Sequence, residues 1–220
     1  MENLVIKGHQ GKLVPNTFFR HKGETLSLAV VYPGYTYRCE MPIIYYLTGV
    51  LVAHGFDVLW VQYAYDKEPD FDIDTSEGRR RFAGDAFSSY QAANKTRSYR
   101  RVMLMGKSIG TLAIADVLRL GASTNSTETV WLTPLLSNIE VRRSLETLST
   151  HSIVIVGTSD SLFDESFIAE IGAKPNLEMV IVAEADHGLE LMNNPLESVE
   201  ILKGLVKVFD RFVAATEKIQ

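Results

Sequence analysis

A serine flanked by two glycines forms the motif with the clearest chemical meaning in the sequence. Residues 106–110 read Gly-Lys-Ser-Ile-Gly and fit the pattern G-x-S-x-G, with Ser108 at the centre. This spacing is typical of a sharp turn between a strand and a helix, in which the glycines let the two backbones pass closely. The turn exposes the hydroxyl at a helix N-terminus, where backbone N–H groups favour negative charge. The motif therefore predicts that Ser108 is a nucleophile.

The Gly-Lys-Ser part of this motif also resembles the end of a phosphate-binding loop. That loop requires a glycine five positions before Gly106, where this chain has Arg101. The apolar run 101–105 leads directly into the motif, with no glycine-rich loop between them. A strand before the motif and a helix after it favour the nucleophile turn instead.

A serine hydroxyl is a weak nucleophile, so it needs a base and a group that orients the base. Of the five histidines, His187 follows the apolar run 179–183, which we predict as a strand. Asp160 likewise follows the predicted strand 152–156. Because the carboxyl ends of parallel strands meet at one edge of a sheet, these two residues and Ser108 are expected there together. Their order and placement predict a Ser-His-Asp triad.

The acid of this triad has competitors in the sequence. Asp164 and Glu165 follow Asp160 closely, and Asp186 directly precedes the histidine. Aspartate is also common in turns and as the N-cap of a helix, so Asp160 has a purely structural alternative. Lys107, inside the serine motif, lies at a position where many residue types occur, and a contact with an acidic group is one option for it.

The elements that must position these residues alternate along the chain. Short runs rich in β-branched and aromatic residues are followed by longer runs with helical spacing, which predicts an α/β fold. We expect a doubly wound, mostly parallel sheet with helices on both faces, and antiparallel edge strands within 4–6 and 12–19. The other predicted strands are 27–32, 56–63, 101–105, 129–132, 152–156 and 179–183, and the predicted helices are 40–54, 76–93, 111–120, 139–148 and 199–216.

The composition is that of a folded globular protein. With 220 residues, of which 46% are hydrophobic, the chain is expected to form a single domain, 1–220, with a sizeable core. The net charge of −5 disfavours nucleic acid as a partner. We expect the basic runs 78–81 and 97–101 to lie on solvated surfaces, the weaker alternative being contact with an anionic substrate or partner.

The single cysteine, Cys39, excludes an intramolecular disulfide and a cluster of thiolate metal ligands. The start of the sequence lacks the pattern of a secretory signal, and there is no run of about 18 apolar residues. We therefore expect a cytoplasmic protein without a membrane-spanning helix.

Taken together, these residues resemble those of the α/β-hydrolase family, and the likeness extends from about residue 27 to the end of the chain. In that family the triad consists of the serine of the nucleophile turn, an acid after the penultimate strand and a histidine after the last strand. The resemblance therefore implies that Ser108 is the nucleophile, Asp160 the acid and His187 the base.

The resemblance also implies an oxyanion hole made by two backbone N–H groups. One belongs to the residue after the nucleophile, here Ile109. The other comes from a loop after an earlier strand, where residues 32–35 read Tyr-Pro-Gly-Tyr and Tyr35 is the candidate donor. The chain departs from the family at two places, since the frequent His-Gly pair of this loop is Pro-Gly and a third glycine of the turn is replaced by Thr111.

The segment between the predicted strands 129–132 and 152–156 has room for one short helix, so no substantial lid is expected. Small size and the lack of a lid resemble the dienelactone-hydrolase-like and small esterase or thioesterase branches of the family. The dienelactone enzymes carry cysteine at the nucleophile position, where this chain has Ser108.

The resemblance implies a serine hydrolase that cleaves a carboxylic ester or thioester of a small-molecule acyl substrate by acyl transfer. This reaction needs neither a metal nor an organic cofactor. A peptidase or amidase would use the same triad, and the sequence does not separate these activities. A catalytically silent binding protein with the hydrolase fold is a further alternative, against which the presence of all three triad residues argues.

Overall fold

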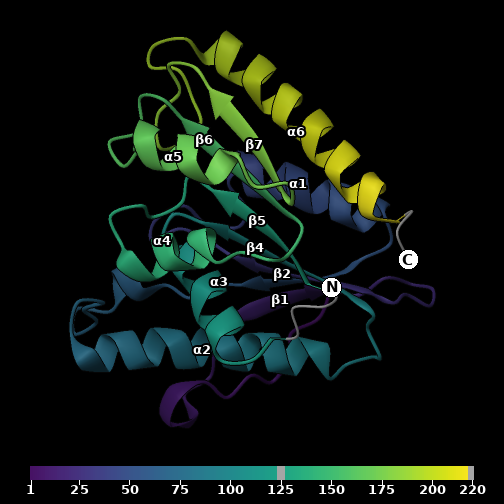
Figure 1. The fold of residues 1–220 in the computed structure, drawn as a ribbon. Helices are drawn as coiled ribbons and strands as arrows, with labels where there is room; N and C mark the ends of the chain where they lie inside the picture. The colour runs from purple at the N-terminus through teal and green to yellow at the C-terminus, as the bar shows by residue number, and fades with distance from the viewer. Residues whose placement is uncertain (123–126, 218–220) are drawn as a thin grey trace.

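The computed structural model of the chain describes residues 1–122 and 127–217, and in this part seven strands form one sheet (Figure 1). The strand order is β1-β3-β2-β4-β5-β6-β7, and β1 alone runs antiparallel to its neighbour in the described sheet. The predicted mostly parallel sheet is thereby confirmed. The strands are β1 (Asn16–Phe19), β2 (Ser27–Tyr32), β3 (Asp57–Val61), β4 (Arg101–Lys107), β5 (Thr127–Leu132), β6 (Ser152–Gly157) and β7 (Leu177–Val182).

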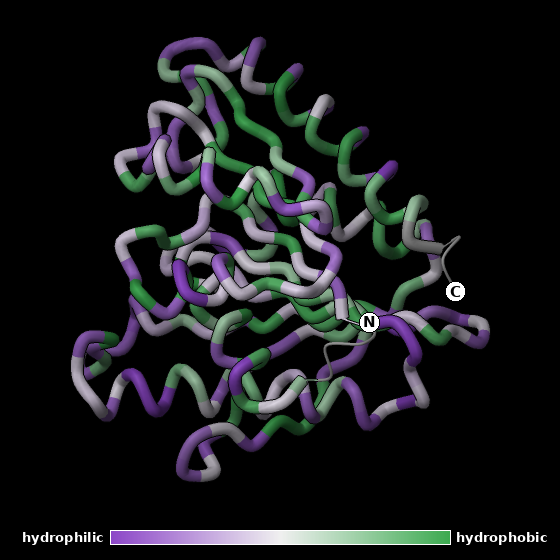
Figure 2. The backbone as a smooth tube through the Cα atoms, viewed as in Figure 1, coloured by the Kyte–Doolittle hydropathy of each residue, from purple (hydrophilic) through white to green (hydrophobic). Residues whose placement is uncertain are grey.

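Helices cover both faces of the sheet, as predicted. One face packs against α1 and α6, and the other packs against α2 and α3, with α4 and α5 beside them (Figure 1). Every residue of β4, β5 and β6 is buried, because a parallel sheet with two covered faces has no solvated side. Figure 2 shows this as hydrophobic colour along the central strands and polar colour on the outer turns. The helices are α1 (Pro42–Ala53), α2 (Ser76–Asn94), α3 (Ile109–Arg119), α4 (Ile139–Glu146), α5 (Glu165–Gly172) and α6 (Pro195–Glu217), with 3-10 turns η1 (His9–Gly11) and η2 (Tyr65–Lys67).

Two predicted segments differ from the structure. The run 4–6 is not a strand, and within 12–19 only β1 is one. Between them the Asn16 side chain hydrogen-bonds the backbone N–H and carbonyl of Leu4, and two isolated antiparallel bridges replace a continuous ladder. The helix α5 was not predicted. It begins at an N-cap, Asp164, which accepts a hydrogen bond from the N–H of Phe167 at 3.1 Å.

The segment between β5 and β6 carries α4, the one helix within residues 133–151, all of which the structure describes. Its buried residues, Val141 and Leu145, join the core that α3 also faces. Since α4 packs against α3 and not above the end of the sheet, the expectation of no substantial lid is confirmed.

Several arginines of the basic runs form ion pairs within the protein. Arg79 binds Asp116 at 2.6 Å and also Glu140, and Arg81 binds Glu68 at 2.7 Å. These pairs satisfy side chains that an anionic partner would otherwise contact.

The prediction of a solvated surface is wrong for Arg101, which is buried and 2% exposed. Its guanidinium donates to both carboxylate oxygens of Glu128, on the neighbouring strand, at 2.9 and 3.0 Å, and to the carbonyl of Val213 at 2.8 Å. This buried pair joins β4, β5 and α6.

Among the described helices, none is long and apolar enough to cross a bilayer.

Replacing Glu128 with glutamine is expected to lower the free energy of unfolding by about 3 kcal/mol, because Arg101 then stays buried opposite a neutral amide. Urea unfolding at pH 7 measures this loss. Glu178→Gln, on an exposed position of β7, is the matched control and should change stability by no more than about 0.5 kcal/mol. Equal stabilities of the two variants would contradict the assigned role of the pair.

Candidate active site

The serine motif forms a tight turn between β4 and α3. Ser108 has a φ of +53° and a ψ of −119°, in the left-handed region that L-residues rarely adopt. The glycines on either side are required by close backbone contacts. A Cβ on Gly106 would lie 2.3 Å from the carbonyl oxygen of Gly110, and one on Gly110 would lie 2.1 Å from that of Tyr32. The strained serine is therefore held by the packing of its own turn against β2.

His187 and Asp160 meet at the same edge of the sheet. Asp160 follows β6, His187 follows β7, and Nδ1 of the imidazole lies 2.6 Å from Oδ2 of the carboxylate. The Asp160 side chain is 4% exposed and that of His187 is 39% exposed. Asp160 also accepts a hydrogen bond from the N–H of Leu162 at 2.9 Å. With Nδ1 held by a buried carboxylate, the other ring nitrogen, Nε2, is left for exchange of a proton.

Two of the competing acids, Asp164 and Asp186, have other partners. Asp164 caps α5 and binds Arg142 at 2.5 Å, and this guanidinium holds the pKa of the carboxyl well below its usual range. Asp186 shapes the segment 183–194 between β7 and α6, called here the histidine loop. Its side chain accepts hydrogen bonds from the N–H groups of Gly188 and Glu190 at 2.7 and 3.1 Å. Among these acids, Asp160 is therefore the one placed against the His187 ring.

The hydroxyl of Ser108 makes no hydrogen bond to another described residue, so its pairing with His187 stays a prediction. The backbone of Ser108 is anchored instead. Its N–H donates to the carbonyl of Leu132 at 3.0 Å, and its carbonyl accepts from the hydroxyl of Thr111 at 2.6 Å. Thr111, which departs from the family's glycine, thus fastens the turn.

The candidate oxyanion donors lie beside the serine. Ile109 is the first residue of α3, so its N–H has no acceptor within the helix. The loop that follows β2 passes over the turn, since a Cβ on Gly34 would lie 3.6 Å from Cβ of Ser108. Hydrogen bonds from Tyr63 to the Pro33 carbonyl, at 2.8 Å, and from Gly34 to Tyr37, at 2.9 Å, fix this loop. The next residue, Tyr35, is 40% exposed, and its role as the second donor stays a prediction.

Among the cavities at this edge of the sheet, two adjoin the serine turn or the loop that carries His187. One, of about 400 Å³, includes Ile109 and the segment before α2. The other, of about 440 Å³, includes Gly188 and lies between the histidine loop and the starts of α1 and α6. The apolar side chains of the second cavity include Ile43, Leu189, Leu191, Met192, Val199 and Leu202. Each cavity thus adjoins a residue next to the serine or the histidine in the chain.

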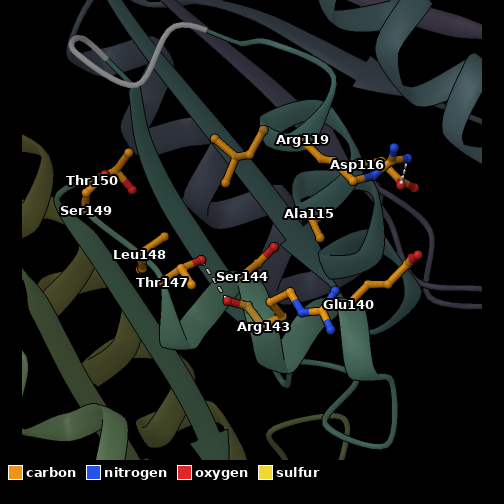
Figure 3. Close-up of a pocket in the computed structure, with 11 residues that line it drawn as sticks. Ala115, Asp116, Arg119, Glu140, Arg143, Ser144, Thr147, Leu148, Ser149 and Thr150 are labelled. Atoms are coloured by element: carbon orange, nitrogen blue, oxygen red, sulfur yellow. Dashed lines mark hydrogen bonds and ion pairs between the residues drawn. The ribbon is translucent and has the colours of Figure 1, made fainter.

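A third cavity, of about 320 Å³, lies at the far end of α3 (Figure 3). Its lining includes Arg119 of α3, Arg143 of α4, Thr147 directly after α4, and Thr150 just before β6. Because a helix rises about 1.5 Å per residue, Arg119 is about 16 Å along α3 from the serine. This cavity therefore lies away from the carboxyl ends of the strands and from the candidate site.

Cys39, which follows the oxyanion loop, is buried and its Sγ lies 3.6 Å from the carbonyl of Val61. Burial raises the pKa of this thiol well above its usual range, which keeps it protonated and unreactive.

Lys107 also lies at this edge and is 1% exposed. The burial of Lys107 could have been predicted from the alternation of side chains along β4, which places residue 107 on the same buried face as Met103 and Met105.

Comparison with known proteins identifies the fold. No known family profile matches the sequence, and no curated protein matches it. A serine hydrolase without a lid from Xanthomonas campestris shares 13% identity over 97% of this chain and 94% of its own, with a TM-score of 0.72. A dienelactone hydrolase from Anabaena variabilis shares 15% over 98% and 97%, with a TM-score of 0.70. An esterase from Pyrococcus furiosus shares 13% over 94% and 90%, with a TM-score of 0.66.

These similarities extend over almost the whole of each chain, so the protein has the α/β-hydrolase fold. The fold that the sequence resemblance implied is thereby confirmed. Identities of 13–15% establish the fold alone, and activity has to be argued from the site.

Replacing Gly110 with alanine is expected to destabilise the protein by about 1–3 kcal/mol, because the new Cβ collides with the Tyr32 carbonyl. Gly204→Ala is the matched control. A Cβ at Gly204, in α6, meets nothing within 4 Å, so this substitution should stabilise the helix by about 0.5–1 kcal/mol. Thermal unfolding of both variants measures the difference, and effects of the same sign would refute the steric argument.

Proposed function

We propose that this protein is a serine hydrolase that cleaves carboxylic esters or thioesters through Ser108, His187 and Asp160. The observation that carries the proposal is the 2.6 Å pairing of His187 Nδ1 with the buried Asp160 carboxylate, at the edge of the sheet where the strained turn holds Ser108. The α/β-hydrolase fold, shared with proteins described as a serine hydrolase, a dienelactone hydrolase and an esterase, supports it.

The reaction begins when Nε2 of His187 takes the hydroxyl proton of Ser108 as Oγ attacks the acyl carbon. Asp160 holds the imidazole in the required tautomer and stabilises its positive charge. A tetrahedral intermediate forms, the bond from carbon to the alcohol or thiol breaks, and the imidazolium returns the proton to the leaving group. Water, activated by the same imidazole, then attacks the acyl-enzyme and releases the carboxylic acid and the free serine.

The negative charge on the carbonyl oxygen of the intermediate needs N–H donors. The N–H of Ile109 is suited to this role because it lies at the start of α3, where the helix favours negative charge. We assign the second donor to the N–H of Tyr35, in the loop that passes over Ser108. In comparable sites one such donor contributes about 3–4 kcal/mol to the stability of the transition state.

The two cavities at the site support a small-molecule acyl substrate with an apolar part. The cavity beside Gly188 is lined largely by apolar side chains, and the absence of a lid over the described site leaves the approach to Ser108 open. Esters with activated alcohol groups, such as nitrophenyl esters, are therefore suitable first substrates.

Ser108→Ala is expected to abolish ester hydrolysis while leaving the melting temperature nearly unchanged, because the oxygen atom that is removed makes no hydrogen bond to another described residue. A fluorophosphonate probe should add once to the wild-type protein and not to the variant, as read by intact mass. Labelling or turnover that persists in Ser108→Ala would refute the assignment of the nucleophile.

Asp160→Asn is expected to lower kcat by about 10³–10⁴-fold, because an amide stabilises the wrong tautomer of His187. Asp164→Asn is the matched control. It removes a neighbouring charge while asparagine still serves as an N-cap for α5. Its kcat should stay within about threefold of that of the wild type. If Asp164→Asn were the damaging variant, the acid would be misassigned.

A further inference from the structure

Lys107 is a buried cation that the proposed mechanism does not use. It is the last residue of β4 and lies between Gly106 and the nucleophile. Its side chain is directed to the face of the sheet that α1 and α6 cover, and the residue is 1% exposed. Burial of an ammonium group is costly unless the group is well paired, so its partners define what it does.

The ammonium of Lys107 contacts three separate loops. Nζ donates to the backbone carbonyl of His187 at 2.6 Å and to the hydroxyl of Thr133 at 2.7 Å. It also lies 4.7 Å from the ring centroid of Tyr37, within the range of a cation–π interaction. These residues follow β7, β5 and β2. One cation therefore connects the histidine loop and the oxyanion loop to the strand that carries the nucleophile.

The histidine loop also has hydrogen bonds of its own. Asp186 and Glu190 pair through their backbones at 3.0 Å, and Leu189, with a φ of +64°, donates to the carbonyl of Asp186 at 3.0 Å. The contact with Lys107 fixes the main chain of His187 itself, while Asp160 holds the ring.

Thr133 carries backbone strain at the contact. It is fully buried and has a φ of +40°, a conformation that is unfavourable for a β-branched residue. Its N–H donates to the carbonyl of Ile155 at 2.8 Å, which keeps it at the edge of the sheet. Strain of this kind persists where the surroundings enforce it and gathers at functional sites. Here its result is a hydroxyl that meets the ammonium.

We propose that Lys107 is a positioning residue, whose ammonium holds the backbone of His187 so that the imidazole stays in place between Asp160 and Ser108. Its effect on turnover rests on the proposed function, whereas its effect on the position of His187 does not. Lys107 touches neither substrate nor the reacting atoms and acts through the histidine loop.

The charge of Lys107 depends on pH in the working range of most enzymes. Burial lowers the pKa of its ammonium to about 8, and the carboxylates of Asp160, Asp186 and Glu190 oppose that shift. Two further titratable residues contact it, His187 through its backbone carbonyl and Tyr37 through its ring, and burial raises the pKa of the Tyr37 phenol. Lys107 therefore loses its charge as the pH rises through about 8, and its charge-assisted bond to the His187 carbonyl then weakens.

The first test is Lys107→Met, with Lys203→Met as the matched control on an exposed site of α6. Lys107→Met is expected to lower kcat for a nitrophenyl ester by about 10- to 100-fold with KM within about threefold, because the base is displaced while binding is not. Lys203→Met should leave both constants unchanged.

The second readout reports His187 without any turnover. The proton between His187 Nδ1 and Asp160 should give a strongly deshielded NMR signal in the wild-type protein. This signal should broaden or vanish in Lys107→Met and persist in Lys203→Met. Lys107→Gln, which keeps a polar donor and lacks the charge, is the second variant and should lie between the two. Circular dichroism establishes that each variant is folded.

The third readout needs no Lys107 variant, so it holds even if none of them folds. The kcat of the wild-type protein should fall severalfold as the pH rises through about 8, because the positioning charge is lost, and Lys203→Met should show the same fall. A kcat that is constant from pH 7 to 9.5 would overturn the proposal.

Two further results would also overturn it: a folded Lys107→Met with an unchanged kcat, or one with an unchanged His187 signal. A wild-type protein without esterase activity whose His187 signal depends on Lys107 would remove the proposed function and support the positioning role.

Discussion

Close contact between backbone segments at the carboxyl ends of the strands is the constraint on which this structure depends. A Cβ at Gly106, Gly110 or Gly157 would lie 2.1 to 2.3 Å from a carbonyl oxygen of a neighbouring segment. The first contact closes the serine turn on itself, the second packs that turn against the end of β2, and the third packs the end of β6 against Ala185, two residues before the histidine. Glycine at these positions therefore lets three distant parts of the chain approach closely around the strained Ser108.

Two buried charged groups, Asp160 and Lys107, then bind His187 at this edge of the sheet. Asp160 is almost fully buried, and its carboxylate accepts hydrogen bonds from the His187 ring and from the N–H of Leu162, which compensate its charge. On the other side of the histidine, the buried Lys107 binds the main-chain carbonyl. A buried anion and a buried cation thus hold one half-exposed imidazole, which is a suitable arrangement for a base that has to accept and return a proton.

Features that a periodic pattern encodes were predictable from the sequence. Buried strands, amphipathic helices and the G-x-S-x-G turn depend on local residue spacing, so the mostly parallel sheet and the position of Ser108 follow from it. Features that depend on long-range contacts were not. Nothing near Lys107 in the sequence indicates His187, 80 positions later. The choice of Asp160 over Asp164 depends on which carboxylate the fold sets against the imidazole. The sequence also does not distinguish an acid of the triad from an N-cap at Asp164, so it does not predict α5.

The proposed triad and oxyanion hole can be tested by a crystal structure of the protein after reaction with a phosphonate inhibitor. We predict a covalent bond from Ser108 Oγ to phosphorus, with Nε2 of His187 in hydrogen-bond contact with the adduct. We also predict that a phosphoryl oxygen accepts hydrogen bonds from the N–H groups of Ile109 and Tyr35. An adduct on another residue, or a phosphoryl oxygen directed away from Ile109, would contradict the proposal.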